Sequence, residues 1–225
     1  MTDTLFQRPC VTLKLATSLD GRIATVAGHS KWITGEHART RVHHMRAAHD
    51  CVLTGIGTVL ADDPELTARL QPSTSHQPLR AVVDSLARTP SNAKLLQTLS
   101  QGPVCLFHDH QHHDACAGLD RIQVAKTPDG SGLDLTEILS ILQNRFHVKT
   151  LMVEAGARLA GSFLRAKLVD KIVWFRAPII LGGDAMSVFS ALGVIELSQA
   201  IRLSCTDVSK VGDDVVETYE LQNQD

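Results

Sequence analysis

The sequence predicts an α/β protein whose central sheet is mixed, mostly parallel, and covered by helices on both faces. Two observations favour this class. Strand-type runs alternate with amphipathic, helix-type segments along most of the 225 residues, and this order is typical of parallel strands joined by right-handed crossovers. The last two strand-type segments, 201–206 and 215–221, have no helix between them. We therefore expect an antiparallel pair at the C-terminal end of the sheet.

The first elements follow from local patterns. Residues 10–16 alternate between apolar and polar side chains, as a half-buried strand requires. Asp20-Gly21 is a turn signal, after which 22–24 can form a short strand. Thr34 is a suitable N-cap for the first helix. The apolar stripe expected on that helix comprises Ala38, Val42, Met45 and Ala48.

The rest of the chain continues the alternation. A glycine opens a short helix at 55–61, and Asp62-Asp63-Pro64 ends it because proline disfavours helix in the preceding residue. Asp134 is expected to cap a helix with an apolar stripe at Leu135, Ile138, Leu139 and Leu142. A further helix is expected at 159–168. The remaining predicted strands are 51–54, 79–84, 104–107, 121–124, 150–154 and 171–176.

Composition bounds the class of protein. Hydrophobic residues make up 44% of the chain, and neither a linker nor a repeat divides it, so we expect a single domain, 1–225, with a core at about 8–221. A net charge of -2 argues against a nucleic-acid surface. No apolar run approaches the ~18 residues of a membrane span, and the N-terminus lacks secretion-signal features. A cytoplasmic location without membrane or nucleic-acid partners is expected.

Cysteine and histidine usage points away from metal sites. The five cysteines include no CxxC pair and are expected to be reduced thiols; they are Cys10, Cys51, Cys105, Cys116 and Cys205. The segment 108–114 is rich in histidine and aspartate, but no second cluster completes a zinc site. We interpret it as a solvated loop and expect no metal. His43, on the first helix, is expected to be exposed.

The most informative stretch is Glu154 to Ser162. It follows the apolar strand-type run 150–153 and opens an amphipathic segment through a turn of small residues. Such a turn aims free backbone N–H groups and the positive end of a helix dipole at an anion. Glycine lets a phosphate approach the backbone closely. Glu154 could accept hydrogen bonds from a second ligand, so the stretch indicates a nucleotide site beside a substrate site.

Other candidates are weaker alone. Gly55-Ile56-Gly57 resembles a dinucleotide fingerprint but lacks the third glycine, and Asp84 is too far along the chain for the expected acidic partner. A glycine-rich turn that contacts a cofactor in a different fold remains open. Arg46 and Arg69 are either surface charges or planar donors for a phosphate. Asp62 is either a helix-ending residue or part of a site.

A set of blocks carries a family resemblance. In order and spacing they are similar to the reductase domain of the bifunctional riboflavin-biosynthesis deaminase/reductase, which has the dihydrofolate-reductase-like, three-layer α/β/α fold. The resemblance runs from about residue 8 to 221. The blocks are Lys14–Ala24, Ser30–Thr34, Arg41–Arg46, Gly55–Thr67, Val83–Ser85, Val153–Gly156 and Leu181–Gly183.

The resemblance implies an NADPH-dependent reductase. Its substrate would be 5-amino-6-(5-phosphoribosylamino)uracil, reduced to the ribitylamino compound by hydride transfer to C1′ of the ring-opened imine. Asp62 and Glu154 would have catalytic roles. The implied substrate contacts are Ser30, Arg46, Leu66, Arg69 and Glu154. The implied cofactor contacts are Ala16, Trp32, Thr58, Asp62, Ser85, Gly156, Ala157, Arg158, Leu159, Ala160, Gly161 and Ser162.

The resemblance also implies a homodimer, and the deaminase half of the bifunctional protein has no counterpart in this sequence. Ser85, with Arg88, would face the adenosine 2′-phosphate. Ala155-Gly156 stands where the family often has two glycines. Two alternatives stay open: a reductase of the same fold that acts on a different pyrimidine or a pteridine, and a nucleotide-binding homologue without turnover.

Overall fold

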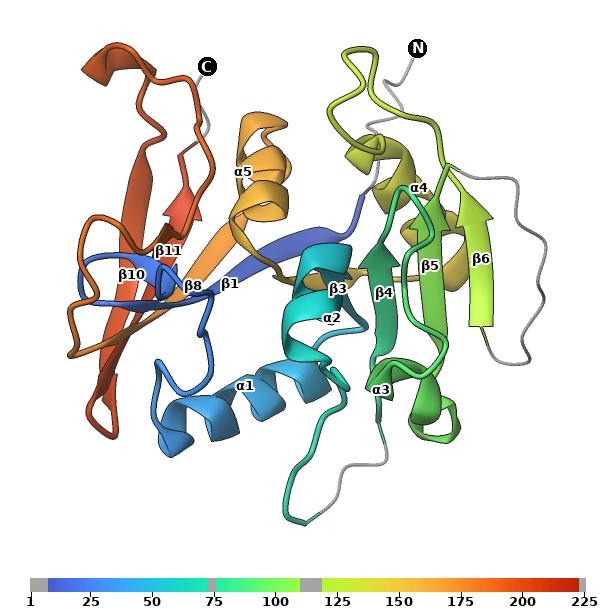
Figure 1. Ribbon diagram of the computed structural model, residues 1–225, viewed down its shortest axis with the longest axis horizontal. Coiled ribbons are helices and arrows are strands. Elements are labelled where there is room, and N and C mark those ends of the chain that lie inside the picture. The colour runs from blue at the N-terminus through green and yellow to red at the C-terminus, as the bar shows by residue number, and fades with distance from the viewer. Residues whose placement is uncertain (1–7, 73–75, 110–118, 223–225) are drawn as a thin grey trace.

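The computed structural model describes residues 8–72, 76–109 and 119–222. Its main feature is a nine-stranded sheet in the order β10-β11-β8-β1-β7-β3-β4-β5-β6 (Figure 1). The strands from β8 to β6 in this order are parallel, and β11 and β10 are antiparallel to their neighbours. Their bounds are β1 (Cys10–Ser18), β3 (Cys51–Gly55), β4 (Leu79–Val83), β5 (Val104–His108), β6 (Leu119–Gln123), β7 (Thr150–Glu154), β8 (Lys171–Ala177), β10 (Leu203–Val211) and β11 (Asp214–Leu221).

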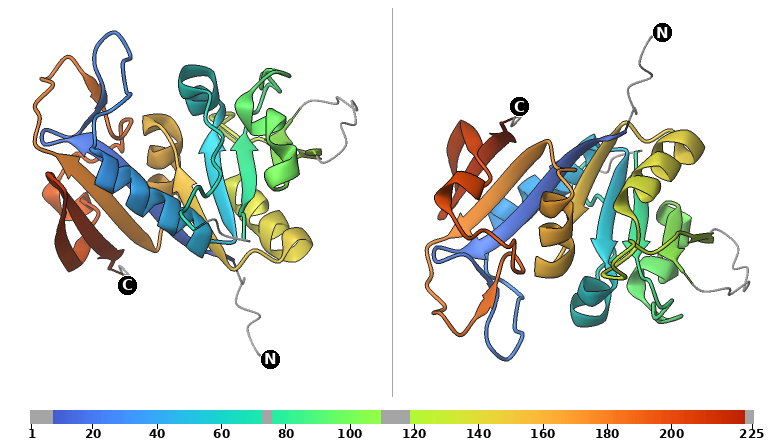
Figure 2. Two further views of the ribbon diagram at one scale, coloured as in Figure 1. Left: turned by 90° about the horizontal axis from the view of Figure 1, so that it is seen from below. Right: turned by 90° about the horizontal axis from the view of Figure 1, so that it is seen from above.

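Helices cover both faces of this sheet (Figure 1, Figure 2). The helices are α1 (Glu36–Ala48), α2 (Ile56–Asp62), α3 (Lys94–Gln97), α4 (Leu135–Phe146) and α5 (Ala157–Arg165). One face packs against α1, α2 and α3, and the other against α4 and α5. The helical connections that run toward β6, through α1, α2 and α3, use the first face, and those that return, through α4 and α5, use the second, as crossovers of one hand require. The predicted three-layer, mixed α/β fold is confirmed.

Several predicted elements have the expected cause. Asp134 caps α4 by accepting from the backbone N–H groups of Thr136 and Glu137 at 2.8 and 3.2 Å. The whole predicted stripe of α4 is buried. The C-terminal hairpin is present, although β10 extends to Val211, five residues beyond the predicted end at 206.

The start of α1 corrects the sequence prediction. The N-cap is Gly35 rather than Thr34, and it makes no side-chain cap. The N–H of Gly35 instead donates to the carboxylate of Asp214 at 2.7 Å. Asp214, near the C-terminal end of the chain, thus determines where this helix begins. Of the predicted stripe, Ala38 and Val42 are buried, whereas Ala48 is exposed; a single methyl group left in water costs little.

The bounds of α5 also differ from the predicted 159–168. The helix starts at Ala157, where small residues with high helix propensity extend it toward the strand. It ends early because Lys167 adopts a left-handed conformation with φ 55°. The N–H groups of Lys167 and Leu168 then bond back to Leu164 and Phe163, a common helix-ending pattern.

Some elements were not predicted. Helix α3 has four residues and is followed by a 3₁₀ turn, Leu99–Gln101. The N–H of Lys94 at its start donates to Asp63 at 2.8 Å, a contact that local sequence does not reveal. A second, two-stranded sheet pairs β2 (Arg22–Ala24) with β9 (Met186–Ser187). Another 3₁₀ turn spans Leu197–Gln199.

The cysteines and the histidine-rich segment can be placed only in part. Cys51 and Cys105 are buried in the core, Cys10 and Cys205 are exposed, and all four are free thiols. His108 is not in a solvated loop, because it is the buried last residue of β5. Cys116 and the predicted loop from 110 onward lie outside the described residues. None of the helices in the described part of the chain is long and apolar enough to cross a membrane.

Candidate active site

The switch point of the sheet lies between two neighbouring parallel strands, β3 and β7. After β3 the chain passes through α2 on one face, and after β7 it passes through α5 on the other. In open α/β sheets ligands bind at the carboxyl ends of strands at such a point. The two turns adjoin, because a Cβ atom added to Gly156 would lie 4.0 Å from the hydroxyl oxygen of Thr58. Two predicted cofactor residues are therefore brought together.

The start of α5 has backbone donors available for an anion. Gly156 is the N-cap and offers no side-chain acceptor. The first amide bonded within the helix is that of Ala160, which donates to the carbonyl of Gly156 at 3.1 Å. The N–H groups of residues 157–159 therefore have no intrahelical acceptor. With the helix dipole they form the anion site that the sequence predicts.

The other three positions of the predicted turn are already engaged in the protein. Ala160 is fully buried in the core. A Cβ atom at Gly161 would lie only 2.5 Å from the hydroxyl of Ser190, so any side chain there would force Ser190 to move. The Ser162 hydroxyl donates to the carbonyl of Arg158 at 3.0 Å and accepts from Arg165. A cofactor contact at these three positions stays a prediction.

A buried ionic cluster lies beside the switch point. Arg46 of α1 binds Glu154 of β7 through two hydrogen bonds of 2.7 and 3.1 Å. Lys14 of β1 pairs in register with Glu154, and its Nζ is 3.9 Å from the carboxylate. The three side chains are only 11–15% exposed. Such a buried group of charges is stable only while all its partners are present.

The charges in this cluster fix the protonation of Glu154. Burial alone would raise the pKa of Glu154, but the positive charges of Arg46 and Lys14 and the hydrogen bonds from Arg46 outweigh it and lower this pKa to about 2. Burial lowers the pKa of Lys14, and the Glu154 charge only partly opposes this. Near neutral pH, Glu154 is therefore a carboxylate that can only accept hydrogen bonds.

Lys14 is absent from the predicted site residues. The sequence shows it only as a polar residue in an alternating strand, where a solvent-facing position is the ordinary interpretation. Its place beside Glu154 depends on the pairing of β1 with β7, which are separated by more than a hundred residues. The only local signal was its position at the start of a family block.

Two of the predicted substrate residues, Leu66 and Arg69, lie on one segment that follows α2, and a third, Arg46, contacts it. Leu66 is buried and has a left-handed backbone with φ 60°. The carbonyl of Thr67 accepts from Arg46 Nη1 at 3.2 Å. Arg69, 54% exposed, pairs with Glu65 at 2.7 Å. Arg46 and Glu154 are thus in direct contact, and the segment that carries Arg69 is bonded to Arg46.

The prediction that His43 is exposed is wrong. It is half-buried against the same segment, with Nδ1 3.2 Å from the carbonyl of Thr67 and 3.2 Å from the amide nitrogen of Arg69. Burial, followed by the charges of Arg46 and Arg69, lowers the pKa of His43. The helix periodicity put His43 off the apolar stripe, but the segment around Thr67 and Arg69 covers this side of α1.

Asp62 links the predicted substrate and cofactor sets. It is the last residue of α2, and its carboxylate accepts from the hydroxyl of Ser30 at 2.6 Å. Trp32, two residues after Ser30, is exposed and has a left-handed backbone with φ 71°. The guanidinium carbon of Arg39 lies 4.3 Å from the centre of the Trp32 ring. The loop that follows β2 therefore meets the end of α2.

The remaining predicted residues lie at the carboxyl ends of neighbouring strands. Ala16 is on β1 and packs against the cluster beneath α1. Ser85 is the second residue after β4, and the buried Asp84 lies between them. Arg88 is exposed, with Nε 3.9 Å from the Asp84 carboxylate. Because β1, β7, β3 and β4 are adjacent and parallel, these ends form one edge.

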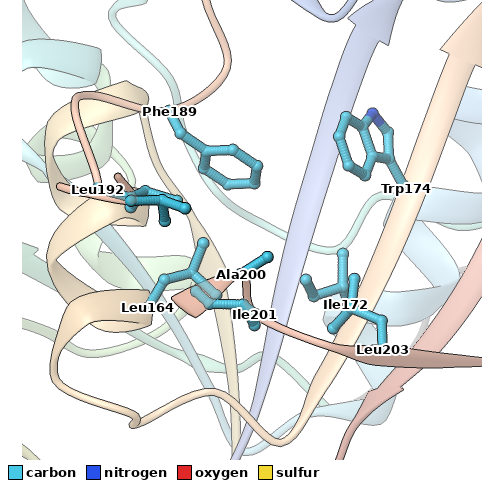
Figure 3. Close-up of a pocket in the computed structure, with 9 residues that line it drawn as sticks. Leu164, Ile172, Trp174, Phe189, Leu192, Ala200, Ile201 and Leu203 are labelled. Carbon is cyan, nitrogen blue, oxygen red and sulfur yellow. The ribbon is translucent and has the colours of Figure 1, made fainter. Parts of the chain in front are cut away.

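An apolar pocket of about 240 Å³ lies apart from this edge, between α5, β8, β10 and the connection that precedes β10. Trp174 and Phe189 are neighbours in its lining, with ring centroids 5.9 Å apart and ring planes nearly perpendicular (Figure 3). The pocket is lined by Leu164, Ile172, Trp174, Phe189, Leu192, Val194, Ala200, Ile201 and Leu203. With no charged lining residue, it does not suit a phosphate.

The fold and the strand-end groups define a doubly wound α/β domain with a free helix N-terminus and a buried guanidinium–carboxylate pair at its switch point. The chain belongs to the RibD C-terminal domain family, whose model matches residues 9–217. It is 37% identical over 212 residues to riboflavin biosynthesis protein RibD of Bacillus amyloliquefaciens, covering 92% of this chain and 56% of that protein. The chain thus spans little more than half the length of such RibD relatives.

Two further comparisons concern a shorter relative and a solved structure. The 2,5-diamino-6-ribosylamino-4(3H)-pyrimidinone 5′-phosphate reductase of Methanothermobacter thermautotrophicus is 35% identical over 218 residues, which are 96% of this chain and 99% of that protein. Acinetobacter baumannii RibD superposes with a TM-score of 0.86 at 31% identity, covering 96% of this chain and 58% of that one.

Proposed function

We propose that this chain is an NADPH-dependent reductase of 5-amino-6-(5-phosphoribosylamino)uracil. The observation that carries the proposal is the buried pair of Arg46 on α1 and Glu154 on β7, next to the N-terminus of α5 with its free amides. The pair suits a phosphosugar-bearing base, and the amides suit the cofactor pyrophosphate. A relative that aligns along 99% of its length is named a reductase of a closely similar ribotide, which supports the reaction class.

In this proposal the chain mainly positions its ligands. When bound, NADPH would provide hydride-transfer chemistry, for which C1′ of the ring-opened imine would be the acceptor. Arg46 and Arg69 bind the ribose 5-phosphate. Glu154 accepts from hydroxyl or amino groups, and Lys14 supplies a donor beside it, a combination suited to a base that carries both carbonyl and amino groups. Holding the reacting carbons in contact is worth ~7–11 kcal/mol of barrier.

Asp62 has the remaining proposed role. Its carboxylate is half-buried at the end of α2 and is held by Ser30 at 2.6 Å. From there it would orient the open-chain sugar or relay a proton to the reduced product. The residues 157–159 would hold the cofactor pyrophosphate through their backbone amides, and Ser85 with Arg88 would face its 2′-phosphate.

The activity is tested by following the nicotinamide absorbance of NADPH with different substrates. Loss of absorbance only with the aminouracil ribotide supports the proposal. Loss with the 2,5-diaminopyrimidinone ribotide or with a pterin instead supports a same-fold reductase of another substrate. The two arginines of the site favour a phosphorylated substrate, since a pterin offers no phosphate. No loss with any of them supports a nucleotide-binding homologue without turnover.

Arg69→Ala should raise the KM for the ribotide about tenfold or more, because a hydrogen bond to a charged phosphate contributes ~1.5–3 kcal/mol. The KM for NADPH should stay nearly constant. Arg69 is largely exposed and its partner Glu65 is accessible, so the fold should be unaffected. Steady-state kinetics with each ligand varied in turn provide the measurement. Equal weakening of both ligands would contradict the phosphate role.

Ser85→Ala combined with Arg88→Ala should lower the preference for NADPH over NADH by about tenfold or more, because donors to the 2′-phosphate are removed. The change also removes the long ion pair between Arg88 Nε and the buried Asp84 carboxylate, which are 3.9 Å apart, so the unfolding temperature is measured alongside. The ratio of kcat/KM values for the two cofactors is the measurement. An unchanged ratio would show that the 2′-phosphate lies elsewhere.

We also propose that the chain acts in the cytosol as a homodimer. Free thiols support the location. Support for the dimer comes from β10, an edge strand with exposed Val208, and from exposed Ile195 and Leu197 near the apolar pocket. Light scattering should give the mass of two chains, and Ile195→Asp with Val208→Lys should give one. A monomeric wild-type protein would contradict the proposal.

A further inference from the structure

His43 lies one helical turn before Arg46 on α1, and both side chains face the segment that carries Arg69. The Thr67 carbonyl already accepts from Arg46 Nη1 at 3.2 Å. The amide of Arg69 donates to Nδ1 of His43, also at 3.2 Å. Two residues of one helix therefore contact two backbone groups of the same segment, one on each side of Ala68.

The surroundings of the ring favour its neutral form. Burial opposes protonation first, and the cations Arg46 on α1 and Arg69 on the segment oppose it further. The Thr67 carbonyl and Glu154 on β7 favour the charged ring, but the balance lowers the pKa of His43. The Glu65 carboxylate is bound by Arg69 and Thr67. Nδ1 also lies 3.2 Å from the Thr67 carbonyl, to which it would donate if it carried the proton. With the proton on Nε2, Nδ1 keeps a lone pair, which is the acceptor that the Arg69 amide requires.

We propose that His43 is a positioning residue of the substrate-phosphate site, and this inference rests on the proposed function. Through Nδ1, the neutral ring holds the backbone of Arg69, so that the Arg69 guanidinium stays on the side of the ligand that Arg46 binds. His43 acts through Arg69 and donates no group to the reaction itself. Its loss changes how the ribotide is held and leaves the cofactor site at α5 unchanged.

Three variants separate this role from general packing. His43→Leu keeps the apolar bulk but removes the acceptor. His43→Asn keeps an acceptor close to the position of Nδ1. His44→Leu alters the exposed neighbour on the same helix turn and serves as the matched control. Each variant is compared with wild type by the KM for ribotide, the KM for NADPH, kcat and the unfolding temperature.

His43→Leu should raise the ribotide KM about tenfold, the factor expected when one hydrogen bond that orients a binding group is lost. The NADPH KM should stay within about twofold, and His43→Asn should restore most of the ribotide affinity. His44→Leu should match wild type. Equal effects on both ligands, or His43→Asn as impaired as His43→Leu, would overturn the proposal in favour of a purely structural histidine.

A second measurement decides the proposal if the ribotide is not the substrate. Ring-nitrogen NMR of the wild-type protein requires no ligand, and it should show an unprotonated Nδ1 and a protonated Nε2 for His43 at neutral pH. The Arg69 amide signal should shift in His43→Leu and stay in place in His44→Leu. A proton on Nδ1, or an Arg69 amide signal that does not shift in His43→Leu, would refute the proposed hydrogen bond from Arg69 to His43, whichever substrate is reduced.

Discussion

Glu154→Gln should lower the free energy of unfolding by about 3–5 kcal/mol, because it leaves two buried cations without their counter-ion. Arg46 and Lys14 both depend on this carboxylate, and the three side chains are 11–15% exposed. Turnover should fall as well, since Glu154 is the proposed acceptor for the substrate. Denaturant unfolding measures the first effect and kcat/KM for the ribotide the second.

The control for Glu154→Gln is Glu65→Gln. Glu65 also pairs with an arginine at 2.7 Å, but Arg69 is 54% exposed. Exposed ion pairs contribute about 0–1 kcal/mol, so this variant should change stability little. Similar losses in the two variants would show that the Arg46–Glu154 pair is no more important for stability than a surface pair. An unchanged kcat/KM in Glu154→Gln would remove Glu154 from the substrate site.

The same carboxylate gives the protein a defined acid sensitivity. The pKa of Glu154 is about 2 in the folded protein against an ordinary 4.5. A lowered pKa stabilises the folded state above the ordinary value, and this contribution is lost as the pH falls from 4.5 toward 2. Wild type should therefore lose stability over this range more steeply than Glu154→Gln. Parallel pH profiles would contradict the charge assignment.

The extent to which the fold could be predicted depends on whether each cause is local. Helix α4 has its cap and its apolar stripe within one segment, and the sequence predicts both correctly. Helix α1 has Gly35 as its N-cap because Asp214, 179 residues away, accepts the Gly35 amide. Helix α3 begins where Asp63 accepts the amide of Lys94. Contacts of this length leave no trace in local patterns.

The candidate site shows the same division. The small residues after Glu154 indicated an anion-binding helix start, yet periodicity could not tell that Gly156 precedes the helix while Gly161 packs against Ser190. Lys14 joined the site only through the register of β1 with β7. Sequence reasoning therefore identified the residue types and the motif, whereas sheet pairing decided which side chains meet.

Gly156→Asp should separate the fold from cofactor binding. Aspartate is among the best N-cap residues, and Gly156 has the extended backbone that an N-cap requires. An added Cβ would meet only the Thr58 hydroxyl, at 4.0 Å. Helix α5 should keep or slightly gain stability, since an acidic group suits its dipole. The new carboxylate would, however, occupy the amides of 158 and 159 proposed for the pyrophosphate.

The expected result is an increase of about 100-fold in the KM for NADPH, which corresponds to the loss of about two charge-assisted hydrogen bonds. Ribotide binding, measured by calorimetry, should be retained because Arg46 and Glu154 lie on α1 and β7, outside the altered turn. Gly156→Asn is the matched control, as it has the same shape and caps the helix without the charge, so its effect should be smaller. An unaltered NADPH KM in a stable Gly156→Asp protein would mean that the start of α5 does not hold the cofactor. The proposed positions of NADPH and the ribotide at the strand ends would then have to be exchanged or abandoned.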